Sequence, residues 1–126
     1  MRILIADDHE IVRKGICAIL ESRKSIDICG EASNGQDAVE KASQLKPDLI
    51  ILDVTMPNLD GFAAARQIRT FLPEVPILIL SMHEGRAVVN EAQQAGAQGF
   101  VSKSDAGAVL LKAVDAITQG QTFFPI

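Results

Sequence analysis

Apolar residues along the chain fall into two alternating patterns. Short continuous apolar runs, such as Leu49 to Leu52, are typical of strands that are buried on both faces of a sheet. Between these runs, apolar residues recur at helical spacing, as Val12, Ile16 and Leu20 do. The pattern predicts strands at 2–6, 26–32, 49–53, 77–81 and 98–101, and helices at about 10–21, from the 33–35 turn to Leu45, from an Asp60 cap to Leu72, at 85–95 and at 106–119.

The helical spacing also predicts which residues of each helix face the core. The fourth helix is poor in large apolar residues, so we expect it to pack more weakly than the others. The inward positions predicted for the five helices are Val12, Ile16, Ile19 and Leu20; Ala38, Ala42 and Leu45; Phe62, Ala65, Ile68 and Leu72; Val88, Ala92 and Ala95; and Val109, Leu110, Ala113 and Ile117.

Five strand–helix units in strict alternation indicate a parallel α/β fold. Parallel strands need crossover connections, which are right-handed and place helices on both faces of the sheet. The expected architecture is therefore a (βα)5 doubly wound parallel sheet. Because the second strand, 26–32, is more polar than the others, it suits a sheet edge. The flavodoxin-like strand order 2-1-3-4-5 fits that placement.

The composition fits a single soluble domain, with 126 residues of which 48% are hydrophobic and 22% charged. No apolar run approaches the length of a membrane span, and Asp7 and Asp8 fall where a signal peptide needs an apolar segment. Cys17 and Cys29 lack metal-ligand spacing and suit reduced buried thiols, so we expect a cytoplasmic protein. A net charge of −4 without a basic run argues against direct nucleic-acid binding by this segment.

Residues with useful chemistry stand at the ends of four predicted strands. Asp7 and Asp8 follow the first strand, Asp53 ends the third, Ser81 ends the fourth and Lys103 follows the fifth. In a parallel sheet these ends share one rim, which is where ligands bind. Three crowded carboxylates need a cation. Oxygen ligands with no His or Cys among them suit Mg²⁺, with Mn²⁺ as an alternative ion.

A carboxylate in such a pocket can accept a phosphoryl group and form an aspartyl phosphate. We interpret Asp53 as that acceptor, with the Lys103 ammonium and the Ser81 hydroxyl stabilising the phosphoryl oxygens. Each residue also has a structural interpretation when taken alone: Asp7 and Asp8 could cap a helix, and Lys103 could be a solvated surface lysine. Their coincidence at one rim favours the functional interpretation.

Several longer motifs surround these residues: Ile5-Ala-Asp-Asp-His9, Asp53-Val-Thr-Met-Pro-Asn-Leu-Asp-Gly61, Leu80-Ser-Met-His83 and Gly99-Phe-Val-Ser-Lys103. With them the chain resembles, over essentially its whole length, the receiver domain of two-component response regulators. Two further motifs make it similar to the NarL/FixJ (LuxR-type) subfamily: Asp7-Asp-His-Glu-Ile-Val-Arg-Lys-Gly15 and Gly30-Glu-Ala-Ser-Asn-Gly35.

The resemblance implies a specific role for each residue at the acidic rim. Asp53 would be the phosphoacceptor. Asp8, Asp53 and the main-chain carbonyl of Thr55 would ligate Mg²⁺ directly, while Asp7 would act largely through water. Lys103 would pair with the phosphoryl group.

The resemblance also implies residues that read the phosphoryl group. Ser81 takes the place of the switch hydroxyl, and Phe100 takes the place of the switch aromatic residue. Thr55 and His83 stand at positions that tune dephosphorylation. Phosphorylation would draw Ser81 toward the new oxygens, and Phe100 would turn into the space that this movement leaves.

The partner implied by the resemblance is a sensor histidine kinase, and the chain would be a signalling domain rather than an enzyme. It would phosphorylate itself in a Mg²⁺-dependent reaction and dephosphorylate slowly. A phosphatase with an aspartyl nucleophile commonly carries a second Asp where this chain has Thr55. A dinucleotide-binding module needs a Gly-rich loop after the first strand, where this chain has acidic residues. A pseudo-receiver that only docks partners is disfavoured by the intact acidic cluster.

The domain organisation expected from the resemblance is a receiver domain at 1–120, followed at 121–126 by the start of a linker. That linker would lead to a helix-turn-helix domain absent from this chain, and DNA would be bound only through that domain. A stand-alone receiver that acts by protein–protein docking is the alternative. Homodimerisation through the first and last helices, or through the face of the last two, stays open. The sequence identifies neither the cognate kinase, nor the stimulus, nor the promoters.

Overall fold

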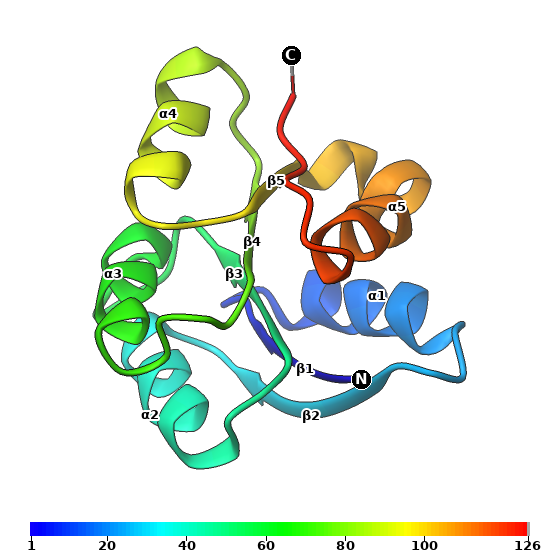
Figure 1. Ribbon diagram of the computed structural model, residues 1–126, viewed down its shortest axis with the longest axis horizontal. Helices are drawn as coiled ribbons and strands as arrows, with labels where there is room; N and C mark the ends of the chain where they lie inside the picture. Colours follow the sequence, from blue (N-terminus) through cyan, green and yellow to red (C-terminus); the bar gives the residue numbers. More distant parts are fainter. Residues whose placement is uncertain (126) are drawn as a thin grey trace.

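Parallel strands form a sheet in the computed structural model, which describes residues 1–125 (Figure 1). The sheet has five strands in the order β2-β1-β3-β4-β5, which confirms the predicted strand order and the edge position of the second strand. The strands are β1 (Arg2–Ala6), β2 (Asp27–Ala32), β3 (Leu49–Asp53), β4 (Ile77–Ser81) and β5 (Gly99–Ser102). The helices are α1 (Glu10–Glu21), α2 (Gly35–Leu45), α3 (Gly61–Phe71), α4 (Arg86–Gln94), the short 3₁₀ helix η1 (Lys103–Asp105) and α5 (Ala106–Thr118).

The helices cover the sheet from both sides and enclose two hydrophobic cores (Figure 1). Helices α1 and α5 pack on one face, where Leu20 and Leu110 are fully buried against the strands. Helices α2, α3 and α4 pack on the other face, where Ile68 and Phe100 lie in the core. Because the three central strands are covered on both faces, they can be almost wholly apolar, apart from Arg2 at the start of β1 and the polar residues Asp53 and Ser81 that end β3 and β4.

A close contact between α3 and the end of β3 explains the Asp60-Gly61 pair. The Asp60 carboxylate accepts a hydrogen bond of 2.8 Å from the main-chain N–H of Ala63 and so caps α3, as its position in the sequence predicted. A side chain at Gly61 would collide with the main-chain carbonyl oxygen of Asp53. A residue without Cβ therefore lets the helix begin directly beside the strand end that carries Asp53.

Helix packing corrects one predicted inward position and adds another. Val12 was expected in the core, but it is 37% exposed, and Ile16, Cys17 and Leu20 are the buried residues of α1. On α4 the predicted Val88 is partly buried and packs against the core, while its neighbour Val89, which was not predicted, is the buried valine. Adjacent residues on a helix differ by about 100° in direction, so a small rotation of the helix decides which of two neighbours faces inward.

Weak packing of α4 is confirmed by the burial of its side chains. The buried residues of α4 are Val89 and Ala92, whereas α3 and α5 each bury five residues. In addition, no side chain caps its N-terminus, where Gly85 precedes the helix at a positive φ of 124°. Helix α4 is therefore held by fewer interactions than the helices around it.

The segment after α5 is more structured than a plain tail. Phe123 forms a parallel β-bridge with Gly99, donating from its N–H to the carbonyl of Gln98 (2.9 Å) and accepting from the N–H of Phe100 (2.8 Å). The edge of β5 is therefore partly covered by the chain itself. Ile126, the last residue of the predicted linker segment 121–126, lies outside the described residues. Within residues 1–125, no helix combines the length and the apolar character needed to cross a membrane.

Candidate functional site

Acidic side chains from two neighbouring strand ends meet at the carboxyl rim of the sheet. Asp7 follows β1 and Asp53 ends β3, and these two strands pair directly through Ala6 and Leu52. The carboxylates of Asp7, Asp8 and Asp53 offer oxygen atoms that lie within 4.8 Å of one another. Asp7 is 0% exposed and Asp53 is 2% exposed, so two of the three charges are removed from solvent.

The Asp7 residue is fixed by its main chain as well as its side chain. Its N–H donates to the carbonyl of Ala32 on β2 (3.0 Å), and its carbonyl accepts from Nη1 of Arg13 on α1 (2.7 Å). One carboxylate oxygen, Oδ1, accepts a hydrogen bond of 2.8 Å from the main-chain N–H of His9. The other oxygen, Oδ2, is thereby pointed toward the neighbouring acids and Lys103.

Lys103 brings a buried ammonium group to these acids from the 3₁₀ helix after β5. Its Nζ lies 2.8 Å from Asp7 Oδ2 and 3.2 Å from Asp53 Oδ2, and its side chain is 9% exposed. Both contacts are ion pairs, and apart from them the two carboxylate oxygens have no hydrogen-bond partner. Burial lowers the pKa of Lys103, but the two carboxylates together outweigh burial and leave the pKa raised. The ammonium therefore stays charged.

Asp53 carries a strongly shifted carboxyl group. Burial and the neighbouring charge of Asp7 raise the pKa of Asp53 from 3.8 to about 6, and the charge of Lys103 opposes that rise. The shift means that one ammonium group does not compensate the charge gathered here. A divalent cation or a protonated partner would relieve it.

The carboxylates fit a hard divalent cation. Asp7 Oδ2 and Asp53 Oδ2 are buried and share the single charge of the Lys103 ammonium without a further hydrogen-bond partner, so a second cationic group would offset the negative charge that remains. Asp8, whose side chain is 28% exposed, can supply a third oxygen from the solvent side. Such an oxygen set is what Mg²⁺ prefers.

The structure corrects one premise about the donor set. The sequence was taken to offer oxygen ligands with no histidine among them, but His9 belongs to the same cluster as Asp7, Asp8 and Asp53. Its Nδ1 lies 3.1 Å from Asp8 Oδ1. The signal was present in the sequence, because His9 directly follows the two aspartates, but the direction of its side chain could not be predicted from spacing.

The predicted switch residues lie on the neighbouring strands β4 and β5. Ser81 ends β4 and is fully buried, and its hydroxyl accepts a hydrogen bond of 2.9 Å from the main-chain N–H of His83. Phe100 lies on β5 with its side chain in the core at 2% exposure. Thr55 lies in the exposed part of the β3–α3 loop, so its carbonyl stays a predicted ligand.

Comparison with known proteins decides the family. The family model for the response regulator receiver domain matches residues 3–115. This chain belongs to the response regulator receiver domain family. The match includes the acidic rim and all five strands except Arg2, the first residue of β1, which fits a signalling domain.

Relatives and solved structures place the chain near LuxR-type regulators. It is 35% identical over 125 residues to the transcriptional regulatory protein LnrK of Bacillus subtilis, covering 99% of this chain but only 57% of that regulator. A LuxR-family response regulator from Aurantimonas has a TM-score of 0.93 and 37% identity, covering 97% of this chain and 87% of that one. The isolated receiver domain of RcsB from Salmonella enterica, solved with the phosphomimetic BeF3-, has a TM-score of 0.91 and 30% identity, covering 99% and 93%.

Proposed function

We propose that Asp53 is the phosphoacceptor of this receiver domain. The observation that carries the proposal is a buried carboxylate oxygen, Asp53 Oδ2, that has no hydrogen-bond partner and lies 3.2 Å from the Lys103 ammonium. A phosphoryl group on Asp53 would bring oxygens that Lys103 can pair with. The arrangement suits a charged adduct better than it suits the free carboxylate.

The transfer itself needs one bond to form and one to break. A carboxylate oxygen of Asp53 attacks the phosphorus of the donor, which is the phosphohistidine of a sensor kinase or a small acyl phosphate. The donor's P–N or P–O bond breaks, and its electron pair leaves with the donor group. Lys103 holds its positive charge against the phosphoryl oxygens as their charge redistributes.

A magnesium ion would be held by Asp8 and Asp53, with the carbonyl of Thr55 as the predicted third protein ligand and Asp7 acting through water. When bound, the ion supplies positive charge that neutralises the acids and the phosphoryl oxygens. Mn²⁺ is the alternative ion. Thr55 and His83 remain candidates for tuning how long the phosphoryl group persists.

The phosphoryl group would be read through Ser81 and Phe100. The Ser81 hydroxyl now accepts from the His83 N–H, so turning toward a phosphoryl oxygen would pull on the loop before α4. Phe100 lines a groove of about 780 Å³ between α4, β5 and the C-terminal segment. Because α4 is weakly held, two positions of this helix can have similar free energies. Shifting their populations from 1:99 to 99:1 needs about 5.5 kcal/mol, which a few charge-assisted hydrogen bonds of about 1.5–3 kcal/mol each can supply.

The output proposed for the full protein is control of transcription. The relatives of this chain include a transcriptional regulatory protein and a LuxR-family regulator, which supports a DNA-binding domain beyond the 121–126 linker. A sensor histidine kinase is the proposed partner in a cytoplasmic location, and homodimerisation on phosphorylation is part of the proposal. A stand-alone receiver acting by docking is the alternative for this chain.

The test is phosphorylation of the purified chain by acetyl phosphate with Mg²⁺, followed by intact-mass measurement. We expect one added phosphoryl group on the wild-type chain and none on Asp53→Asn. An adduct that persists in Asp53→Asn, or an unchanged wild-type mass, would contradict the proposal. Ser81→Ala should still be phosphorylated on Asp53 but should lose the response around Phe100, which NMR shifts of β5 can follow.

A further inference from the structure

The side chain of His9 has no structural task among the contacts of residues 1–125 that would explain its position. His9 is the residue that precedes α1, yet its imidazole makes no capping hydrogen bond to the helix. Its main-chain N–H already bonds to Asp7 Oδ1, so the ring is not needed to hold that carboxylate. The ring is 59% exposed, and its Nδ1 lies 3.1 Å from Asp8 Oδ1 and 3.6 Å from Asp7 Oδ1.

Two other oxygens of the same cluster point to a cation. Asp7 Oδ2 and Asp53 Oδ2 are buried and have no hydrogen-bond partner, and the Lys103 ammonium, at 2.8 and 3.2 Å, gives the two of them a single positive charge to share. One ligand atom from each of Asp7, Asp8, His9 and Asp53 can be chosen so that all four lie within 4.8 Å of one another. Donors about 2.1 Å from a metal lie at most about 4.2 Å apart, so binding a single ion would have to draw these four atoms together by up to about 0.6 Å.

We propose that Nδ1 of His9 is a nitrogen ligand of this site, which therefore takes nitrogen-preferring transition ions of the Ni²⁺ and Zn²⁺ class more tightly than Mg²⁺. The inference rests on the proposed function, since it assigns a further ligand to the same acidic rim. Imidazole suits such ions, whereas Mg²⁺ favours carboxylate, carbonyl and water oxygens. A receiver with this donor set would sense which divalent ion occupies its phosphoacceptor site.

A competing explanation is that a protonated His9 simply pairs with Asp8. The two explanations differ in the sign of the effect when the ring is removed. An imidazolium competes with every cation for the carboxylates, so its loss would tighten the binding of Mg²⁺ and Ni²⁺ alike. If the ring is instead a metal ligand, its removal weakens the binding of Ni²⁺, which it coordinates, and leaves the binding of Mg²⁺ nearly unchanged. Because outer-shell changes alone alter metal affinity about 10–100-fold, losing a direct ligand should weaken Ni²⁺ binding at least about tenfold.

Calorimetric titration of the tag-free full chain with Ni²⁺ and with Mg²⁺ at pH 7.5 tests the selectivity. We expect His9→Gln to weaken Ni²⁺ binding about tenfold or more and to leave Mg²⁺ binding within about twofold. Unchanged or tighter Ni²⁺ binding in His9→Gln would overturn the proposal. An equal loss for both ions would also overturn it, because that result assigns His9 to the fold of the site and not to the ion.

Electron spin-echo spectroscopy with bound Cu²⁺, a paramagnetic ion that imidazole suits, tests ligation directly, since a coordinated imidazole gives a ¹⁴N coupling. The chain has two histidines, so His83→Gln is the matched variant. We expect the coupling in the wild type and in His83→Gln, and its loss in His9→Gln. A coupling that survives in His9→Gln, or that is missing from the wild type, would overturn the assignment.

The two proposals fail separately. If His9→Gln still gains a phosphoryl group on Asp53 from acetyl phosphate with Mg²⁺ while its ion selectivity is unchanged, the assignment of His9 is wrong and the phosphoacceptor proposal stands. If the wild type binds Ni²⁺ through His9 but gains no phosphoryl group, the phosphoacceptor proposal is wrong and the metal ligand stands.

Discussion

The two ends of the sheet differ in how their charged side chains are bonded, with a half-buried arginine at one end and buried carboxylates at the other. At the amino end, the guanidinium of Arg69 is enclosed by acceptors, which lie 2.6–3.1 Å away and are the carbonyls of Leu72, Pro73, Val75 and Gly96 and the side-chain oxygen of Gln98. At the carboxyl end, Asp7 Oδ2 and Asp53 Oδ2 have no hydrogen-bond partner. A charged group that is fully bonded supports the fold, whereas one left incomplete is available to a ligand.

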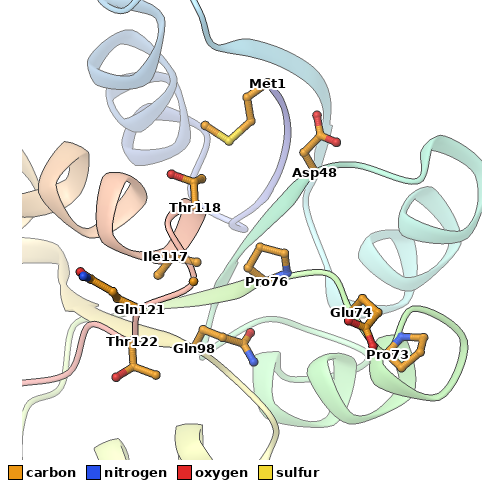
Figure 2. A pocket seen from close by; sticks show the side chains of 11 residues that line it. Met1, Asp48, Pro73, Glu74, Pro76, Gln98, Ile117, Thr118, Gln121 and Thr122 are labelled. Atoms are coloured by element: carbon orange, nitrogen blue, oxygen red, sulfur yellow. The ribbon is translucent and has the colours of Figure 1, made fainter.

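The same contrast appears in the hollows at the two ends. The amino end carries a hollow of about 570 Å³ whose lining includes Asp48, Glu74 and Gln98 (Figure 2). Gln98 is already committed there, because its side-chain oxygen accepts from both Arg69 and the N–H of Ile77. The cluster of possible metal ligands found within residues 1–125 lies at the other end. A cavity alone therefore does not identify the functional rim. Buried carboxylate oxygens without hydrogen-bond partners do.

Arg69→Met should give the largest loss of stability. The substitution leaves several carbonyls at the α3–β4 and α4–β5 connections without their donor, and each buried unsatisfied group costs about 1–3 kcal/mol. Because water can reach some of them, we expect a loss of about 3 kcal/mol in the free energy of unfolding, measured by urea denaturation. Arg66→Met on the exposed side of the same helix should stay within about 0.5 kcal/mol. A similar loss from both variants would contradict the structural role of the Arg69 network.

Asp53→Asn should raise the free energy of unfolding, whereas Arg69→Met lowers it. Burial and the charge of Asp7 raise the pKa of Asp53 to about 6, so at pH 7 the folded chain carries a carboxylate that it disfavours. Removing that charge should stabilise the ion-free protein by up to about 3 kcal/mol, the equivalent of about two pKa units. The gain should fade as the pH falls through about 6 toward 4, where the folded wild type is protonated as well. Thermal unfolding in EDTA at pH 7 and pH 4.5 measures it, with exposed Asp27→Asn as the control.

The sequence predicted the carboxyl end of the sheet better than the amino end, and the reason is physical. Strand ends follow from apolar runs, and parallel topology then forces Asp7, Asp53 and Lys103 onto one rim. The Arg69 network depends on where irregular loop carbonyls point, which no periodicity encodes. The bridge of Phe123 to β5 was missed for the same reason. The sequence shows that His9 follows the two aspartates, but it does not predict the side-chain conformation that brings the ring to Asp8.

The stabilisation by Mg²⁺ at the carboxyl end should not depend on the Arg69 network at the amino end. Ligand binding at ten times its dissociation constant adds about 1.4 kcal/mol to the wild type. Five-residue strands separate the two ends by about 16 Å, so Arg69→Met should keep that increment even though the protein is weaker overall. Asp53→Asn should lose most of it. Thermal shifts with and without Mg²⁺ measure the increments, and a smaller increment in Arg69→Met would show that the two ends are coupled.

Arg13 is a hydrogen-bonded charged side chain at the carboxyl end of the sheet, the end where Asp7 Oδ2 and Asp53 Oδ2 have no hydrogen-bond partner. It therefore tests whether a bonded charge at this end supports the fold as Arg69 does at the other. Its Nη1 donates to the carbonyl of Asp7 and its Nε to Glu31 Oε1 (2.8 Å), and its side chain is 13% exposed. Arg13→Met should cost about 1 kcal/mol, since Lys14 still pairs with Glu31. It should also weaken Mg²⁺ binding, because the main chain of Asp7 loses a support. Lys14→Met, at a side chain that is 57% exposed, should stay within about 0.5 kcal/mol.

The pH dependence of that loss identifies its cause. Burial raises the pKa of Glu31, but its hydrogen bonds to Arg13 and Lys14 outweigh burial and leave the pKa lowered. A lowered folded pKa adds stability that is present above the unfolded value of about 4.3 and is lost as the pH falls through the folded value. The gap between wild type and Arg13→Met in urea denaturation should therefore narrow below pH 4 to what the Asp7 contact alone contributes. A gap that stays constant down to pH 3 would assign the whole effect to Asp7 and none to the charge of Glu31.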